Sequence, residues 1–140
     1  MSQHGSFEIS SDAEEVETLL NRLESILEQS CLNELSAFQL RCAVVEVVNN
    51  CIQHAYAFQG GQPVGISYQL EPERVEIRVS DQGRAFDGKT DGPRAAPDDE
   101  SGRGLEIVRA WVSDVRFSRE DGWNICCLEQ HRDAGKNQTA

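Results

Sequence analysis

A chain of 140 residues with 39% hydrophobic and 26% charged side chains has the composition of one globular domain, not of a disordered or fibrous protein. Its net charge of −11 disfavours a nucleic-acid partner, because binding to that polyanion depends on Lys and Arg. No apolar run reaches the ~20 residues that cross a bilayer, and residues 1–15 do not resemble a signal peptide. We therefore expect a single cytoplasmic domain over residues 1–140.

The first apolar periodicity predicts an amphipathic helix from about Asp12 to Gln29, with Ser11 or Asp12 as its N-cap. A second, longer helix is predicted from Ser36 to about Phe58. The glycine pair at 60–61 and the following Pro63 end it.

After Pro63 the apolar residues alternate with polar ones, first at Ile66, Tyr68 and Leu70 and then at Val75, Ile77 and Val79. Alternation on both sides of a short turn predicts an antiparallel hairpin with one buried face. A second hairpin is predicted from the strands Val115–Arg119 and Trp123–Gln130, with Asp121-Gly122 as its turn. Both Trp111 and Trp123 are expected in the core.

Between the hairpins lie a stretch without apolar periodicity at about 84–101 and a third predicted helix from about Gly104 to Ser113. The polar tail 132–140 is expected to fray. Two helices, a hairpin, a helix and a hairpin predict an α+β sandwich, with the helices on one face of the sheet.

The five cysteines form no C-x-x-C pair, so the sequence has neither a zinc ribbon nor a thioredoxin-like motif. Cys51 and His54 could supply two metal ligands, but no matching second pair is visible. We expect reduced cysteines that act as small apolar side chains: Cys31, Cys42, Cys51, Cys126 and Cys127.

Three polar residues of the second predicted helix, Glu46, Asn50 and His54, recur every four positions and therefore share one helix face. This face lies roughly opposite the apolar positions Val44 and Val48. Such a row is usually a solvated helix surface, and the alternative is that it lines a site.

Two later segments contain glycine at positions that suit a ligand. Asp81 and Gly83 follow the second strand of the first hairpin, and two interpretations are open. They could form a plain turn, or they could present a carboxylate beside a glycine that lets a planar ligand approach the backbone. Gly102-Arg103-Gly104 opens the third predicted helix, where free N–H groups and the helix dipole favour a phosphate. The segment matches neither the dinucleotide fingerprint nor Walker A.

In order and spacing, these pieces resemble the Bergerat-fold ATP-binding superfamily of histidine kinases, DNA gyrase and heat-shock chaperones. The N box corresponds to Glu46–Tyr56, the first glycine box to Asp81–Asp87 and the second to Gly102–Leu105. Over about Ala13 to Glu129 the chain is most similar to bacterial stand-alone anti-sigma factor serine/threonine-protein kinases. The resemblance implies a two-layer α/β sandwich with helices on one face of a mixed, mainly antiparallel sheet.

The resemblance implies ATP and Mg²⁺ as ligands. Asn50 would give its side-chain carbonyl to Mg²⁺, a hard ion that prefers oxygen. Asp81 would accept a hydrogen bond from the adenine amino group, and Gly83 would give the purine room. The remaining nucleotide contacts would be His54, Phe86, Gly102, Arg103, Gly104 and Leu105, with 84–101 as the ATP lid.

Glu46, one turn before Asn50, would be the catalytic residue that accepts the proton of an attacking hydroxyl. His54 has a second reading as a phosphoacceptor, but histidine kinases carry that residue on a separate helical domain. The chain departs from the superfamily pattern at Ala85, where many members have Gly, and at Glu106, where some have a small residue or Thr. The lid region has few basic residues, namely Lys89, Arg94 and Arg103.

The implied activity is phosphorylation of a serine on a STAS-domain anti-sigma factor antagonist, with partner switching between that antagonist and a sigma factor. No transducer domain is expected in 140 residues, so ATP hydrolysis alone would drive nothing. A homodimer through the first helix or the sheet is expected, with no direct nucleic-acid or membrane partner. The alternatives are a nucleotide-dependent binding module that transfers no phosphate and an ATPase domain of a larger chaperone-like machine.

Overall fold

The computed structural model describes residues 2–84 and 100–132, with backbone alone for residues 100–105. In chain order the elements are β1 (Gln3–Ser10), α1 (Glu15–Glu28), α2 (Glu34–Asn50), the π-helical turn η1 (Cys51–Ala55), β2 (Pro63–Leu70), β3 (Arg74–Asp81), α3 (Glu100–Trp111), β4 (Asp114–Glu120) and β5 (Trp123–His131). Within the described ranges, no helix is long and apolar enough to span a membrane.

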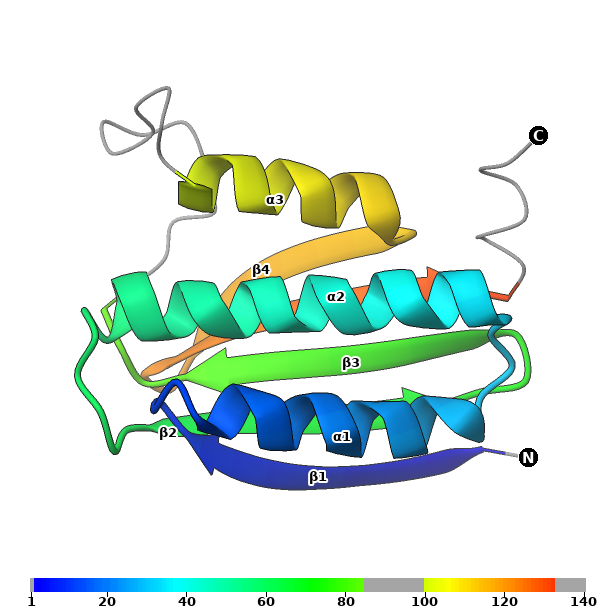
Figure 1. Ribbon diagram of the computed structural model, residues 1–140, viewed down its shortest axis with the longest axis horizontal. Coiled ribbons are helices and arrows are strands. Elements are labelled where there is room, and N and C mark those ends of the chain that lie inside the picture. Colours follow the sequence, from blue (N-terminus) through cyan, green and yellow to red (C-terminus); the bar gives the residue numbers. More distant parts are fainter. Residues whose placement is uncertain (1, 85–99, 133–140) are drawn as a thin grey trace.

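The strands form one sheet in the order β1-β2-β3-β5-β4, and α1, α2 and α3 all cover the same face of it (Figure 1). Each pairing among the described strands is antiparallel. The structure thus confirms the predicted two-layer α+β architecture. Both predicted hairpins are present, as β2–β3 and β4–β5.

The core lies between the helices and the sheet. In the central strand β3, Val75, Ile77 and Val79 face the helices and are almost completely buried. From the helical layer, Leu19 and Leu23 of α1 and Leu40, Val44 and Val48 of α2 are fully buried. Alternation in the strands and helical spacing in α1 and α2 therefore point to the same interface, as the sequence predicts. Trp111 and Trp123, expected in this core, are only half-buried.

The first strand, β1, is not predicted from the sequence. It pairs with β2, placing Phe7 opposite Ile66 and Ile9 opposite Val64. In this edge strand only Ile9 is buried, so its apolar alternation is too short to stand out among polar residues. Its conformation depends on pairing with β2, a partner more than fifty residues away in sequence.

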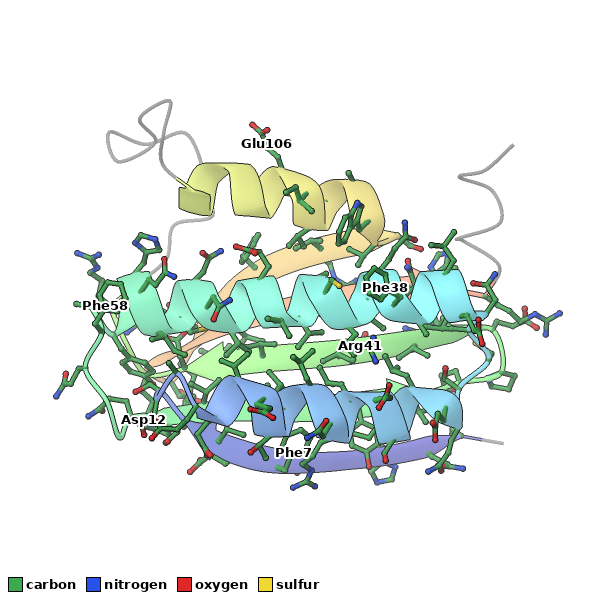
Figure 2. The ribbon with its side chains drawn as sticks, viewed as in Figure 1. Phe7, Asp12, Phe38, Arg41, Phe58 and Glu106 are labelled. Atoms are coloured by element: carbon green, nitrogen blue, oxygen red, sulfur yellow. The ribbon has the colours of Figure 1, made fainter. Side chains whose placement is uncertain are left out.

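The helix boundaries differ from the predicted ones for local reasons. α2 begins at Glu34 rather than Ser36, because the Asn33 side chain caps it by accepting from the Ser36 N–H at 2.8 Å. The second predicted helix stops short of Phe58: after η1, Ala57 and Phe58 take positive φ values of 50° and 66°. Phe58 ends up 72% exposed, beyond the C-terminal end of the helix (Figure 2).

α1 and α3 also begin at other residues than predicted. α1 begins at Glu15 instead of Asp12. α3 begins at Glu100, four residues before the predicted start at Gly104, so Gly102 and Gly104 lie inside the helix. Of the predicted lid, residues 85–99 lie outside the described part of the chain, as do the tail residues 133–140.

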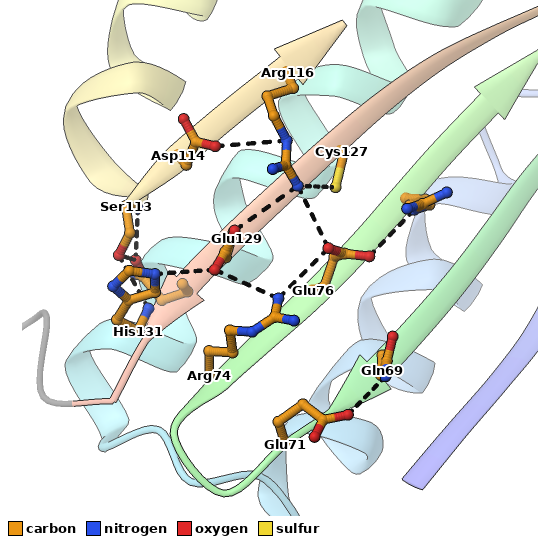
Figure 3. A network of polar contacts seen from close by, with 12 residues as sticks. Gln69, Glu71, Arg74, Glu76, Ser113, Asp114, Arg116, Cys127, Glu129 and His131 are labelled. Atoms are coloured by element: carbon orange, nitrogen blue, oxygen red, sulfur yellow. Dashed lines mark hydrogen bonds and ion pairs between the residues drawn. The ribbon is translucent and has the colours of Figure 1, made fainter. Parts of the chain in front are cut away.

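The sheet face opposite the helices carries a network of ion pairs (Figure 3). The carboxylates of Glu76 and Glu129 lie opposite each other on β3 and β5. Arg74 contacts them at 3.5 and 3.4 Å, and Arg116 at 3.4 and 3.8 Å. This part of the outer face is therefore polar but has its charges paired within the chain.

Candidate functional site

Asp81 ends strand β3 as a buried carboxylate, with 5% of its surface exposed. Its Oδ1 accepts hydrogen bonds from the Gly83 N–H at 2.8 Å and from Asn124 Nδ2 at 2.9 Å. The Cys51 thiol donates to Oδ2 at 3.2 Å. A buried carboxylate needs such donors to offset the loss of water, and these three fix its position.

Cys51, the first residue of the π turn, packs directly against this carboxylate. Burial, followed by the negative charge of Asp81, raises the pKa of the Cys51 thiol well above its usual value. The thiol therefore stays protonated at neutral pH and acts as a donor. This role was not predicted: the sequence favoured a small apolar side chain over a metal ligand.

Gly83 lies where the exit of β3 passes close to the π turn. A Cβ added to Gly83 would stand 2.3 Å from the Ala55 carbonyl oxygen. The next residue, Arg84, donates its N–H to that same oxygen at 3.0 Å. Glycine is thus required by the approach of two backbone segments, in addition to the room for a purine that the family resemblance implies.

Tyr56, the residue after the π turn, also contacts the chain segment that leaves β3. Its buried hydroxyl donates to the Pro63 carbonyl and accepts from the Gln82 N–H, both at 2.6 Å. The hydroxyl therefore connects the end of η1 to the start of β2 and to the residue after Asp81.

Glu46 and Asn50 are half-buried rather than solvated. Asn50 shares a side of α2 with Ser36, because fourteen residues are close to four helical turns. The Ser36 carbonyl accepts from Gln130 Nε2, which also donates to the Trp111 carbonyl in α3. Gln130 thus joins the start of α2 to the end of α3, and the N-terminal end of α3 lies along the C-terminal half of α2, which carries Asn50 (Figure 1).

The Asn50 side chain has a buried Nδ2 with no hydrogen-bond partner among the described residues. A buried amide without a partner is costly, so this group is a candidate for a ligand contact. Because a carboxamide can turn over, the same buried position can present an oxygen instead.

His54 lies in the π turn, so it does not continue the α-helical row of Glu46 and Asn50 at the predicted angle. A π turn has more residues per turn than an α-helix, and such turns are frequent at functional sites. His54 is half-buried beside this turn.

The second glycine box lies in the first turns of α3. The first N–H groups of a helix have no partner within it, and Gly102 lies in the first turn of a helix that starts at Glu100. Of Leu105 and Arg103 only the backbone is described, and Phe86, Ala85, Lys89 and Arg94 lie outside the described residues. Glu106 is exposed and points away from the sheet (Figure 2).

These residues fit a nucleotide and a magnesium ion. Asp81 offers a buried acceptor, Asn50 a carboxamide whose buried Nδ2 has no partner among the described residues, and α3 the N-terminal end of a helix. Among residues 2–84 and 106–132, no three His, Cys, Asp or Glu side chains converge on a metal site. A single amide ligand is compatible with Mg²⁺, which commonly takes its other ligands from phosphates and water.

A family model described as "Histidine kinase-like ATPase domain" matches residues 9–129. The chain belongs to this family. The match includes every candidate residue, from Glu46 through Asp81 to Leu105.

Within the histidine kinase-like ATPase family, the chain is similar to several serine kinases. It is 33% identical over 92 residues to the serine-protein kinase RsbW of Halalkalibacterium halodurans, covering 59% of this chain and 56% of the relative. It is 32% identical over 101 residues to the serine/threonine-protein kinase BtrW of Bordetella bronchiseptica, covering 67% and 70%. Against RsbW of Listeria innocua the identity is 27% over 95 residues, or 60% of that relative. The chain thus spans little more than half the length of the RsbW relatives.

A solved structure has the same fold. The RsbU and RsbW domains of Rv1364c from Mycobacterium tuberculosis match 93% of this chain and 32% of that chain, with a TM-score of 0.68 and 18% identity. The fold of the chain is therefore the one that its family model describes.

Proposed function

We propose that this protein is an ATP- and Mg²⁺-dependent protein-serine/threonine kinase whose substrate is a serine of a STAS-domain anti-sigma factor antagonist. In the same proposal it binds a sigma factor, or an equivalent regulator, in exchange for that antagonist. The similarity to RsbW and BtrW kinases supports the reaction class. The observation that carries the site is the buried Asn50 Nδ2 without a hydrogen-bond partner among the described residues, in the half of α2 along which the N-terminal end of α3 lies (Figure 1).

Asp81 and Asn50 would hold the two ends of the nucleotide. Asp81 accepts a hydrogen bond from the adenine amino group, and the Asn50 side-chain oxygen binds Mg²⁺. When bound, Mg²⁺ neutralises phosphate charge. Gly83, His54 and Phe86 are further nucleotide contacts in this proposal, and Gly102–Leu105 would bind the phosphates.

Glu46 would be the catalytic base. It lies one helical turn before Asn50 on the same half-buried side of α2, and so is close to the phosphate end of the nucleotide. Its carboxylate would accept the proton of the attacking serine hydroxyl.

The test is transfer of radiolabel from ATP to the cognate antagonist. We expect Glu46→Gln to bind ATP like the wild type and to transfer label roughly 10²–10⁴-fold more slowly, the usual contribution of a general base. Glu34→Gln is the matched control, because Glu34 is an exposed acid at the other end of the same helix. Wild-type protein that binds ATP but labels no antagonist would favour the binding-module alternative.

The partners belong to the same proposal. The net charge of −11 favours encounter with the basic surface of a sigma factor over direct contact with nucleic acid. A cytoplasmic homodimer is proposed as well, and light scattering coupled to size-exclusion chromatography measures its mass directly.

A further inference from the structure

Asn124 is a buried polar residue of β5, 6% exposed, and it lies directly opposite Asp81 in the sheet. Its Nδ2 donates to Asp81 Oδ1 at 2.9 Å, to the Arg84 carbonyl at 2.8 Å and to the Gly83 carbonyl at 3.4 Å. One amide group thus holds the carboxylate and the chain segment that leaves it.

The orientation of this amide matters, because a carboxamide that turns over exchanges its oxygen and nitrogen. A turned Asn124 would direct its oxygen at the Asp81 carboxylate and at two carbonyl oxygens. These three oxygens disfavour that orientation, and Arg119 of the edge strand β4 adds to the preference: its Nη1 donates to Asn124 Oδ1 at 2.7 Å and to the Gly83 carbonyl at 3.4 Å. A guanidinium has donors and no acceptor, so it stabilises only the observed orientation.

The two carboxylate oxygens of Asp81 consequently differ in how many hydrogen bonds they accept. Oδ1 is occupied by the N–H of Gly83 and by Asn124. Among the described residues, Oδ2 receives only the Cys51 thiol, which is a weak donor. Oδ2 is therefore the oxygen with capacity left for a donor from outside the chain.

We propose that Arg119 and Asn124 are positioning residues that aim Asp81 Oδ2 at the amino group of the bound base. This rests on the proposed function, because the nucleotide is its ligand. It also gives Arg119, an exposed residue outside all three sequence motifs, a part in base selection.

The experiment compares binding of ADP and inosine diphosphate by calorimetry. Inosine carries a carbonyl where adenine carries the amino group, so only ADP can donate from that exocyclic position to the aimed carboxylate. We expect Arg119→Met to weaken ADP binding roughly tenfold and to leave inosine diphosphate binding unchanged, with Arg119→Lys restoring part of the loss. Arg116→Met, the same change on the outward-facing side of β4, should alter neither affinity.

Equal losses for both nucleotides, or no loss for either, would overturn the positioning role. Arg119 is exposed, so its replacement is expected to fold even if Asn124→Ala does not. A second readout separates this inference from the proposed function: the Asn124 side-chain NH₂ signals in ¹⁵N NMR without nucleotide. We expect Arg119→Met to shift these signals and to speed their exchange with water. Unchanged signals refute the inference, whereas wild-type protein that binds neither nucleotide refutes the proposed function.

Discussion

Single side chains connect the segments around Asp81, and Tyr56 shows how much one hydroxyl can contribute. Its oxygen donates to the carbonyl of Pro63 at the start of β2 and accepts from the N–H of Gln82 after β3. One hydroxyl thus links both segments to the end of the helix. Burial raises the pKa of this phenol above its usual value of 10, so it remains a donor throughout the physiological range.

Tyr56→Phe should lower the free energy of unfolding by about 1–3 kcal/mol, because it leaves the Pro63 carbonyl and the Gln82 N–H without their partner. Urea denaturation measures the change. Tyr68→Phe is the control, since no hydrogen bond is found for the Tyr68 hydroxyl among the described residues, and it should stay within about 0.5 kcal/mol. Equal effects of the two changes would contradict the assigned role.

At the scale of elements, α2 and α3 are held together at the end remote from Asn50 by a buried side chain of β5. Gln130, 0% exposed, donates to the Ser36 and Trp111 carbonyls and accepts from the N–H and hydroxyl of Ser113. These four hydrogen bonds satisfy the amide completely and fix the start of α2 against the end of α3. The opposite ends of these helices carry the candidate site.

Gln130→Met keeps the length of the side chain but removes all four hydrogen bonds. We expect a loss of roughly 2–4 kcal/mol in the free energy of unfolding, because several buried groups lose their partner together. Thermal or urea denaturation measures it. Gln69→Met on the exposed side of β2 is the matched control and should be nearly neutral. A neutral Gln130→Met would mean that apolar packing alone joins the helices.

For the whole molecule, the outer-face network makes stability depend on pH. Burial tends to raise the pKa of Glu76, but Arg78, the Cys127 thiol and Arg74 outweigh it and hold that pKa below its usual value of 4.5. A carboxyl group whose pKa is lower in the folded state stabilises the fold at pH values above its unfolded-state pKa. This stabilisation is lost as the pH falls through the folded-state pKa.

Glu76→Gln should therefore be less stable than the wild type at pH 7, by about 0.5–1 kcal/mol for partly exposed ion pairs. The difference should shrink as the pH is lowered from 7 to 3. Urea unfolding at both pH values tests this. Glu73→Gln, in the exposed turn before β3, gives the baseline for a carboxylate outside the network. A difference as large at pH 3 as at pH 7 would show that the carboxyl acts through packing and not through charge.

The sequence by itself determined the helical and strand periods, both hairpins, and the order of Glu46, Asn50, Asp81 and Gly102 that placed the chain in its family. These features are local: apolar spacing reports which side of an element is buried, whatever it packs against. The tertiary structure alone decided that β1 is a strand and that the second helix passes into a π turn. It also brought Cys51, Asn124 and Arg119 to Asp81. Each of these features depends on residues that are distant in the chain. The apolar period of a segment, two or 3.6 residues, shows which of its sides is buried but not which strand or carboxylate it will contact.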